Sequence, residues 1–228
     1  MDTARIAALL HPFVGRTLPA VQLQQISTYI DLLIRWNARI NLTSIRQPDQ
    51  IVTRHFGESL FLARHLFPEP GVGPTSWSAK TSPHPAHSDA EIIRVLDIGS
   101  GAGFPGLPLK IWAPTISLTL VESNHKKAAF LREVTRALTL TDVNVTTARA
   151  ETLPGTIPAA DVVTLRAVER FDAILPLAAR LVSPAGRLAL LIGSSQLPAL
   201  QNLAPDFRPA APIPIPQSAS RVLSIMVR

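Results

Sequence analysis

The segment VLDIGSGAGFPG, from Val95 to Gly106, decides the fold of this 228-residue chain. The apolar run at 93–98 predicts a buried strand, and glycines follow it at positions 99, 101, 103 and 106. Glycine lets the backbone turn sharply and approach a ligand closely. A helix is expected next, with Pro105 in its first turn. Strand, glycine loop and helix in this order indicate an α/β domain with a ligand at the carboxyl end of the strand.

The segment 91–228 alternates short β-type runs with helical stretches. This alternation predicts βαβ units and a mostly parallel seven-stranded sheet. The clearest runs are 94–98, 117–121, 143–147, 161–165, 187–192 and 221–227, and the clearest helices are 126–138 and 171–181. Five prolines between 205 and 216 leave no crossover helix before the last run. The last strand is therefore expected to return antiparallel.

The segment 1–67 has a different pattern, with apolar residues at helical spacing. It predicts a helical N-terminal extension of three or four helices, with the polar break N-L-T-S at 41–44. Five prolines at 68–90 predict a linker or exposed loop, ordered or disordered, between this extension and the domain at 91–228. His84 and His87 lie there without a cysteine beside them, and we expect no metal site.

Composition narrows the function. The chain has no cysteine, which excludes disulfides and thiolate chemistry and fits a reducing cytoplasm. The sequence contains no run of 18 apolar residues, so we expect no membrane-spanning helix. Residues 1–10 lack the pattern of a signal peptide. The net charge is +6, and 18 of the 22 basic residues are arginines, which favours a polyanionic partner such as nucleic acid. A GC-rich gene is the alternative source of the arginines. A monomer is the default expectation.

The glycine loop contains G-x-G-x-x-G (Gly101, Gly103, Gly106), which is also typical of dinucleotide sites. Asp97 argues against a pyrophosphate and suits the positively charged methionine end of S-adenosylmethionine. Phe104 and Pro105 occupy turn positions where a pyrophosphate needs free N–H groups. The loop therefore favours S-adenosylmethionine. A nicotinamide or flavin dinucleotide, or a glycine turn without ligand, remains the alternative.

Polar residues follow three further strands at the same edge of the sheet. Glu122 follows Gly101 by 21 residues, a spacing that brings a carboxylate to a ribose diol. Ala150 and Glu151 follow the third strand, where a backbone N–H and a side chain reach an adenine edge. Arg166 ends the fourth strand and is expected to point into the ligand crevice. The alternatives are a helix cap for Glu122, an ordinary loop acid for Glu151 and a surface charge for Arg166.

With these residues, the sequence resembles those of the bacterial ribosomal RNA small-subunit methyltransferase G family, also called glucose-inhibited division protein B. The resemblance covers most of the chain outside 68–90. Its specific parts are N-L-T-S at 41–44, Arg54-His55 with Ser59, and the loop G-x-G-x-P-G. Further matches are Trp36-Asn37, 97–109, Glu122-Ser123 with Lys126, 130–132, 149–151 and Arg166-Ala167.

The resemblance implies methyl transfer from S-adenosylmethionine to N7 of one guanine in 16S ribosomal RNA, alone or in the small subunit. It also implies a Rossmann-like domain behind a helical extension. Carried over by position, cofactor contacts fall on Gly99, Phe104, Ala150, Glu151 and Arg166, with Glu122 at the ribose. The glycine loop itself adds Asp97, Gly101 and Gly103 to the expected cofactor site. Other activities left open are methylation of another RNA or a small molecule, nucleotide-dependent oxidoreduction, and RNA binding without catalysis. The chain departs from the family at Ile192, where lysine is usual, and at Glu58, where aspartate is usual.

Guanine N7 carries a lone pair and no proton, so alignment rather than a general base is expected to drive the reaction. We expect Asn41, Arg54, His55 and Ser59 to form the RNA side, with Arg54 on a phosphate. His55 and Ser59 would order the loop or the base, although His55 as a packed helix residue is equally compatible with the sequence. A basic footprint with strong salt dependence is expected from Arg35, Arg39, Arg46, Lys126, Lys127 and Arg132.

Overall fold

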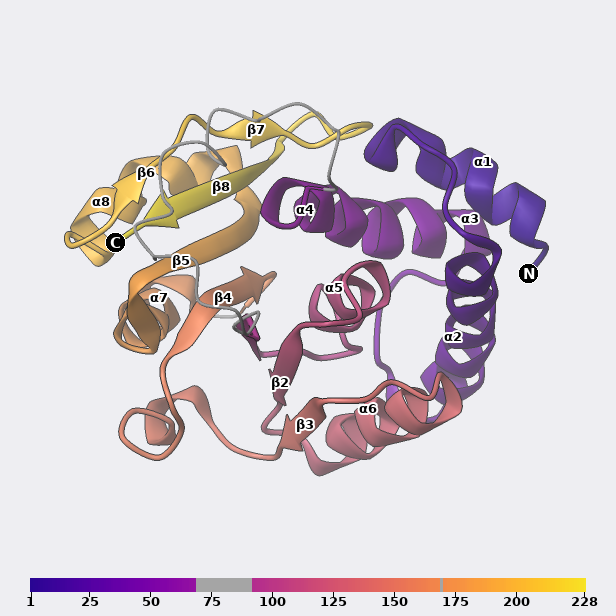
Figure 1. Cartoon of the computed structure of the whole chain (residues 1–228), viewed down its shortest axis with the longest axis horizontal. Coiled ribbons are helices and arrows are strands. Elements are labelled where there is room, and N and C mark those ends of the chain that lie inside the picture. The colour runs from indigo at the N-terminus through magenta and orange to yellow at the C-terminus, as the bar shows by residue number, and fades with distance from the viewer. Residues whose placement is uncertain (69–91, 169) are drawn as a thin grey trace.

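The computed structural model describes residues 1–68, 92–168 and 170–228 (Figure 1). One sheet runs in the order β3-β2-β1-β4-β5-β8-β6, with β7 also paired to β8. The strands are β1 Arg94–Ile98, β2 Ser117–Val121, β3 Val143–Thr146, β4 Ala160–Arg166, β5 Val182–Gly193, β6 Arg208–Pro209, β7 Ile213–Pro214 and β8 Arg221–Val227. The described residues thus form eight strands where seven were expected. Six of the eight coincide with the runs named from the sequence, and the proline-rich segment contributes the other two, both short and paired with β8.

The six runs predicted from the sequence are all strands. The pairs β1–β2, β1–β4, β2–β3 and β4–β5 are parallel, and β8 is antiparallel to β5, as expected. In that pair Gly193 stands opposite Arg221. The first residue of β8 therefore lies beside the carboxyl end of β5, at the edge where a ligand is expected.

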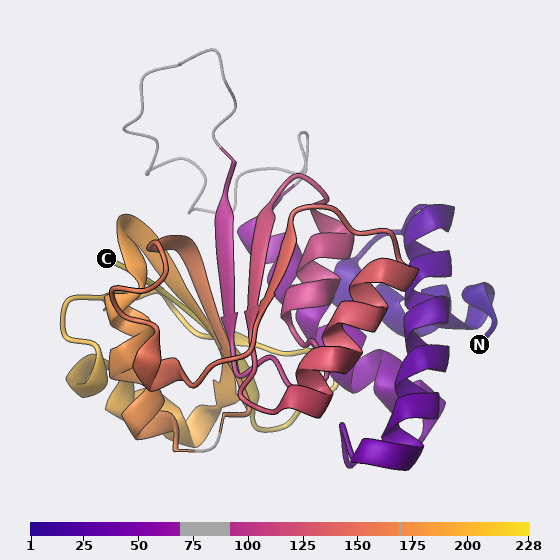
Figure 2. The ribbon, with the colours of Figure 1, turned by 90° about the horizontal axis from the view of Figure 1, so that it is seen from below.

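Helices cover both faces of the sheet, as Figure 2 shows. They are α5 Gly106–Trp112, α6 His125–Ala137, α7 Phe171–Arg180 and α8 Leu200–Leu203, with 3₁₀ turns η2 Ala150–Thr152 and η3 Ser194–Ala199. Alternate residues of β1 and β4 face opposite ways. Val95 and Val162 join the core under α5 and α6, and Leu96 and Val163 join the core under α7. None of the helices described here is long and apolar enough to cross a membrane.

The N-terminal extension consists of α1 Thr3–Val14, α2 Ala20–Ile40 and a continuous helical stretch made of α3 Pro48–Gln50, η1 Ile51–Gly57 and α4 Glu58–Leu66. The predicted break after α2 is confirmed, with Asn41 in the left-handed region at φ 48°. The middle part, η1, is a π-helix. Such π segments are rare and often lie at functional sites. Arg54 and His55 belong to it.

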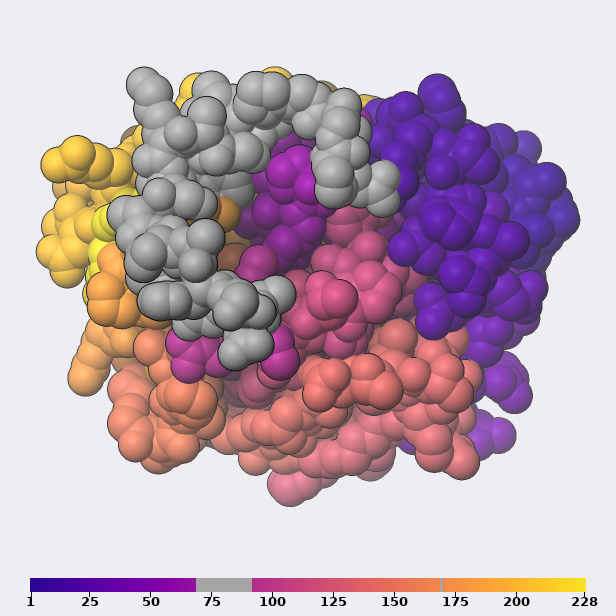
Figure 3. Space-filling view, in the orientation of Figure 1, coloured from indigo at the N-terminus to yellow at the C-terminus, as the bar shows by residue number. Residues whose placement is uncertain are grey.

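The extension shares one hydrophobic core with the sheet face that carries α5 and α6. Tyr29 of α2 is fully buried, stacks on Phe104 at 5.3 Å and meets the edge of Phe56 at 5.1 Å. Its hydroxyl donates to the Ala102 carbonyl oxygen within the glycine loop. Figure 3 shows the extension in continuous contact with the sheet domain. Packing therefore ties the loop to helices that precede it in the chain.

Candidate active site

The strand order changes direction between β1 and β4. From β1 the chain moves outward to β2 and β3, and it then crosses to the other side of β1 to form β4 and β5. Ligands of such sheets bind at the carboxyl ends of the strands beside this switch point. A cavity of about 1020 Å³ lies there. Its walls include Gly99, Gly101, Phe104, Glu122, Ala150, Glu151, Arg166 and Ile192 from the domain, and Asn41, Thr43, Arg54, His55 and Glu58 from the extension.

Glu122 anchors the glycine loop from the end of β2. One carboxylate oxygen accepts a hydrogen bond from the Gly101 N–H at 2.8 Å, and the other accepts from the Asn124 N–H, also at 2.8 Å. Gly101 has a φ of 56°, which glycine adopts without strain. The side chain is 7% exposed and lines the cavity. Glu122 thus fixes the loop backbone while it faces the space where a nucleoside is expected.

Asp97 lies beneath the loop instead of in the cavity wall. Its carboxylate accepts from the Thr164 hydroxyl at 2.8 Å and from the Gly106 N–H at 3.3 Å. Burial raises the pKa of Asp97 to about 6. These hydrogen bonds turn the carboxylate toward the loop, and Asp97 is not among the residues that line the cavity. Gly103 also lies outside the lining, with Tyr29 packed against it.

The remaining predicted cofactor residues lie at the cavity. Ala150 is buried, and Glu151 is exposed and pairs with Arg170 at 2.8 Å, both at the turn after β3. Arg166 extends from the end of β4 toward the helical extension, with 11% of its side chain exposed. Its Nη2 donates to the Arg54 carbonyl oxygen at 2.7 Å. Arg166 is therefore no surface charge but a bridge between the two sides of the cavity.

Three arginines surround the carboxylate of Glu58. The distances to its oxygens are 3.2 Å from Arg54 Nε, 3.4 Å from Arg166 Nη2 and 2.6 Å from Arg221 Nη2. Glu58 is only 2% exposed. We call these four residues the Glu58 cluster. One carboxylate against three guanidinium groups leaves two positive charges at the cavity wall, which suits an anionic ligand.

His55 is both packed and part of the cavity wall. Its ring stacks on Phe104 with centroids 4.7 Å apart. Nδ1 lies 3.1 Å from Arg166 Nη2, and Nε2 lies 2.9 Å from Thr43 Oγ1. Burial, together with the charge of Arg166, lowers the pKa of His55 to about 3. The imidazole is therefore neutral at physiological pH, with both nitrogens engaged.

The structure brings together three of the four residues expected on the RNA side. Asn41, Arg54 and His55 line the cavity, and Arg54 is half-exposed. Ser59 does not line it, because this residue is fully buried and its hydroxyl donates to the His55 carbonyl oxygen at 2.6 Å. Ser59 supports the helix that carries His55.

Arg221 is the residue that sequence reasoning missed. No local motif marks it, and the only signal was the expected antiparallel return of the last strand, which places the start of that strand at the ligand edge. It lies one position along the register from Ile192, whose side chain is apolar and 4% exposed. Other basic residues of the lining are Arg149, Arg170 and Lys127, and of these only Lys127 belongs to the expected basic footprint.

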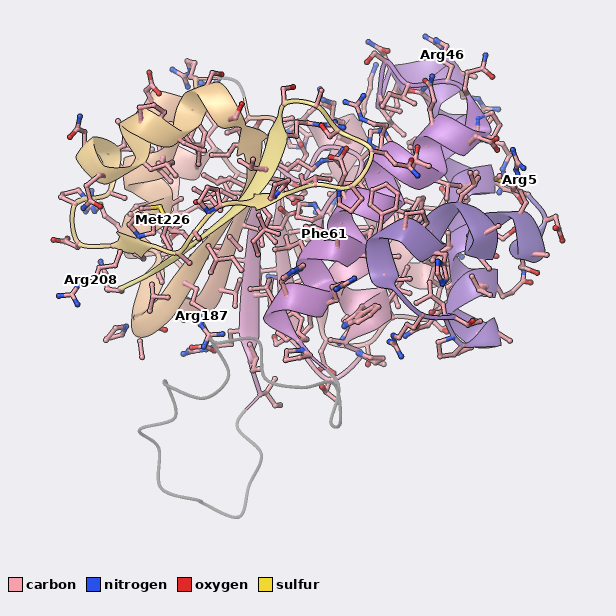
Figure 4. All side chains as sticks on the ribbon, turned by 90° about the horizontal axis from the view of Figure 1, so that it is seen from above. Arg5, Arg46, Phe61, Arg187, Arg208 and Met226 are labelled. Atoms are coloured by element: carbon pink, nitrogen blue, oxygen red, sulfur yellow. The ribbon has the colours of Figure 1, made fainter. Side chains whose placement is uncertain are left out.

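The residues of the expected basic footprint lie on and after α2 and on α6, two helices that pack together. Most are exposed. Figure 4 shows Arg46 at the end of the molecule opposite Arg187. Arg132 is held by hydrogen bonds to the Val145 carbonyl oxygen and the Thr147 hydroxyl.

In the described ranges, no group of three or more His, Asp or Glu side chains is placed to hold a metal ion.

Solved structures share this fold at low sequence identity. The fibrillarin/Nop5p complex gives a TM-score of 0.52 at 16% identity and covers 60% of this chain and 72% of the other. TYW2 from M. jannaschii, in complex with AdoMet, gives 0.50 at 15% identity over 60% and 68%. These likenesses confirm the Rossmann-like fold of methyltransferases.

The sequence relatives are much closer. Proteins named ribosomal RNA small subunit methyltransferase G are 42% identical in Roseiflexus castenholzii, over 79% of this chain and 69% of the relative, and 38% identical in Chloroflexus aggregans, over 94% and 85%. The model of the family described as rRNA small subunit methyltransferase G matches residues 22–70 and 78–207. The chain therefore belongs to the rRNA small subunit methyltransferase G family.

Proposed function

We propose that this chain transfers the methyl group of S-adenosylmethionine to N7 of a guanine in 16S ribosomal RNA. Its family membership supports the reaction and the RNA. The observation that carries the assignment is the composition of the cavity. An anchored glycine loop with a buried carboxylate forms one part of the wall, and the positively charged Glu58 cluster forms another.

The residues of the loop side fit the cofactor. Glu122 presents a carboxylate to the cavity, where ribose hydroxyls donate to such an acceptor. Gly99 and Gly101 allow close approach of the backbone, and Ala150 and Glu151 line the part of the wall expected for the adenine. Once bound, S-adenosylmethionine supplies an electrophilic methyl group on a sulfonium. Asp97 acts indirectly, by holding the loop in place.

His55, the one histidine among the described residues that line the cavity, is not placed to act as a general base, and this reaction needs none. His55 is neutral, but both its nitrogens are engaged and its pKa is about 3, so it does not take up a proton at neutral pH. Guanine N7 has a free lone pair. The protein's contribution is then to align the nucleophile with the methyl group and to exclude competing orientations.

The Glu58 cluster, which includes the half-exposed Arg54, supplies the contact to the RNA backbone. Two excess positive charges at a partly buried wall attract phosphate, and the exposed arginines of α2 extend this attraction. Binding should therefore weaken steeply between low and moderate salt. The substrate is the 16S RNA or the small subunit that contains it, and the protein acts on it in the cytoplasm as a monomer.

The test is methyl transfer from tritiated S-adenosylmethionine to small ribosomal subunits that lack this modification. We expect label in the 16S RNA, and strand cleavage specific for N7-methylguanine should map it to one position. Label on another nucleotide atom, or on no RNA at all, would refute the proposal. An oxidoreductase is distinguished by melting temperature, because S-adenosylhomocysteine should raise it and NAD⁺ should not.

A further inference from the structure

The hydrogen bonds around His55 determine which of its nitrogens carries the proton. Arginine has only donors, so the Nδ1 atom that faces Arg166 Nη2 at 3.1 Å accepts a hydrogen bond. A neutral imidazole then carries its proton on Nε2. That N–H donates to Thr43 Oγ1 at 2.9 Å.

The Thr43 hydroxyl accepts a second hydrogen bond, from the Ile45 N–H at 3.1 Å. A hydroxyl oxygen has two lone pairs, and both are now occupied. Its proton must therefore point away from His55 and Ile45. Within the described part of the chain, no acceptor takes this proton, and the residue lines the cavity.

The backbone of Thr43 is fixed by Asn37. The Asn37 amide donates to the Thr43 carbonyl oxygen and accepts from the Thr43 N–H, each at 2.9 Å. Asn37 is buried at the end of α2, so this clamp belongs to the core. The hydroxyl is thus held in place, with its two acceptor positions filled from the protein side.

We propose that Thr43 is a specificity-determining residue, whose hydroxyl donates to the O6 atom of the target guanine. Arg166 and His55 are positioning residues that keep the hydroxyl a donor. The proposal rests on the proposed guanine substrate. N7 and O6 are neighbouring acceptors on one edge of guanine, whereas adenine presents an amino donor where guanine has O6. A fixed donor in the cavity, facing this edge of the base, would accept guanine and reject adenine.

The test compares two RNAs, one with guanine and one with 2-aminopurine at the target position. 2-Aminopurine keeps N7 and lacks O6. On guanine RNA, we expect Thr43→Val to lower kcat/KM about tenfold and Thr43→Ser to restore it to within about twofold. On 2-aminopurine RNA, the valine variant and the unaltered protein should agree within about twofold. If 2-aminopurine RNA is methylated too slowly to measure, the affinity of each protein, bound to S-adenosylhomocysteine, for the two RNAs gives the same comparison.

Thr53→Val is the matched control, because the Thr53 hydroxyl donates to the Asp49 carbonyl oxygen and does not line the cavity. If Thr43→Val lowers kcat/KM equally on both RNAs, the proposal is overturned. It is also overturned if the loss of kcat/KM is explained by an equal loss of affinity for S-adenosylhomocysteine. If the unaltered protein fails to methylate guanine RNA, the proposed function fails instead, and the two outcomes are distinct.

Discussion

The two sides of the cavity are built in different ways. The glycine loop side uses backbone groups from one short stretch, held by the carboxylates of Asp97 and Glu122. The other side uses side chains from η1, α4, β4 and β8, held together by one carboxylate, that of Glu58. A contiguous stretch leaves a motif in the sequence. An assembly from distant segments leaves none, and its stability depends on a single group.

The largest effect is expected from Glu58→Gln. The change leaves three guanidinium groups without their carboxylate, two of them largely buried. We expect a loss of about 4 kcal/mol in the free energy of unfolding, measured by urea denaturation. Asp49→Asn, which breaks the exposed pair with Arg5, is the control and should leave the urea midpoint unchanged. A small loss for Glu58→Gln would show that the cluster is not held together by this carboxylate.

Gly103→Ala tests the loop side in the same assay. Gly103 has a φ of 91°, and an added Cβ would lie 2.3 Å from the Tyr29 hydroxyl and 2.6 Å from Leu107 Cδ1. Backbone strain and overpacking should together cost about 3 kcal/mol. Gly155→Ala has a similar φ of 81° in open space and should cost only about 1 kcal/mol. Equal costs would mean that Tyr29 does not restrict the loop.

The pH dependence of stability should separate the two sides. Asp97 has a folded pKa of about 6 against 3.8 unfolded, so the folded state binds more protons and stability falls as pH rises between about 4 and 6. His55 has a folded pKa of about 3 against 6.5, so its contribution rises with pH over about 3 to 6.5. The two contributions oppose each other.

Asp97→Asn should expose the contribution of His55. Acidification from pH 6 to pH 4 should then destabilise the variant by about 2 kcal/mol more than the unaltered protein. Urea denaturation at both pH values measures this difference. Parallel pH profiles for the two proteins would show that Asp97 does not titrate in this range.

The smallest effect is expected from Glu122→Gln on cofactor affinity. Loss of the charged acceptor should weaken S-adenosylhomocysteine binding about tenfold, measured by calorimetry. Glu133→Gln on α6 removes an acid that does not line the cavity, and it should leave the affinity unchanged. If Glu122→Gln leaves the affinity unchanged, the Glu122 carboxylate does not make the proposed contact with the ribose.

Much of the fold could be predicted from the sequence, because alternation and helical spacing are local. All six strand runs, the antiparallel return and the helical extension were expected from such patterns. The two-residue strands β6 and β7 were not, since only pairing with β8 defines them. The glycine loop was recognised for the same local reason, but the direction of the Asp97 carboxylate depends on Thr164, which is 67 residues away.

The side of the cavity that holds the Glu58 cluster could be predicted only in part from the sequence. Arg54 and His55 were expected there, but Arg221 lies far along the chain from both and joins them only through the antiparallel register. The Thr43 hydroxyl was hidden inside a recognised motif. Its role depends on a proton assignment that passes through His55 to Arg166, which no sequence spacing shows.

The central claim is that the Glu58 cluster contacts the RNA while the glycine loop side binds the cofactor. It is tested most directly by Arg54→Ala, with two quantities measured on one preparation. We predict that kcat/KM for small ribosomal subunits falls about tenfold or more, while affinity for S-adenosylhomocysteine stays within about twofold. Arg208→Ala, an exposed arginine distant from Arg46 in Figure 4, should change neither. Unchanged methylation in Arg54→Ala, or an equal loss of both quantities, would contradict an RNA wall that is separate from the cofactor wall.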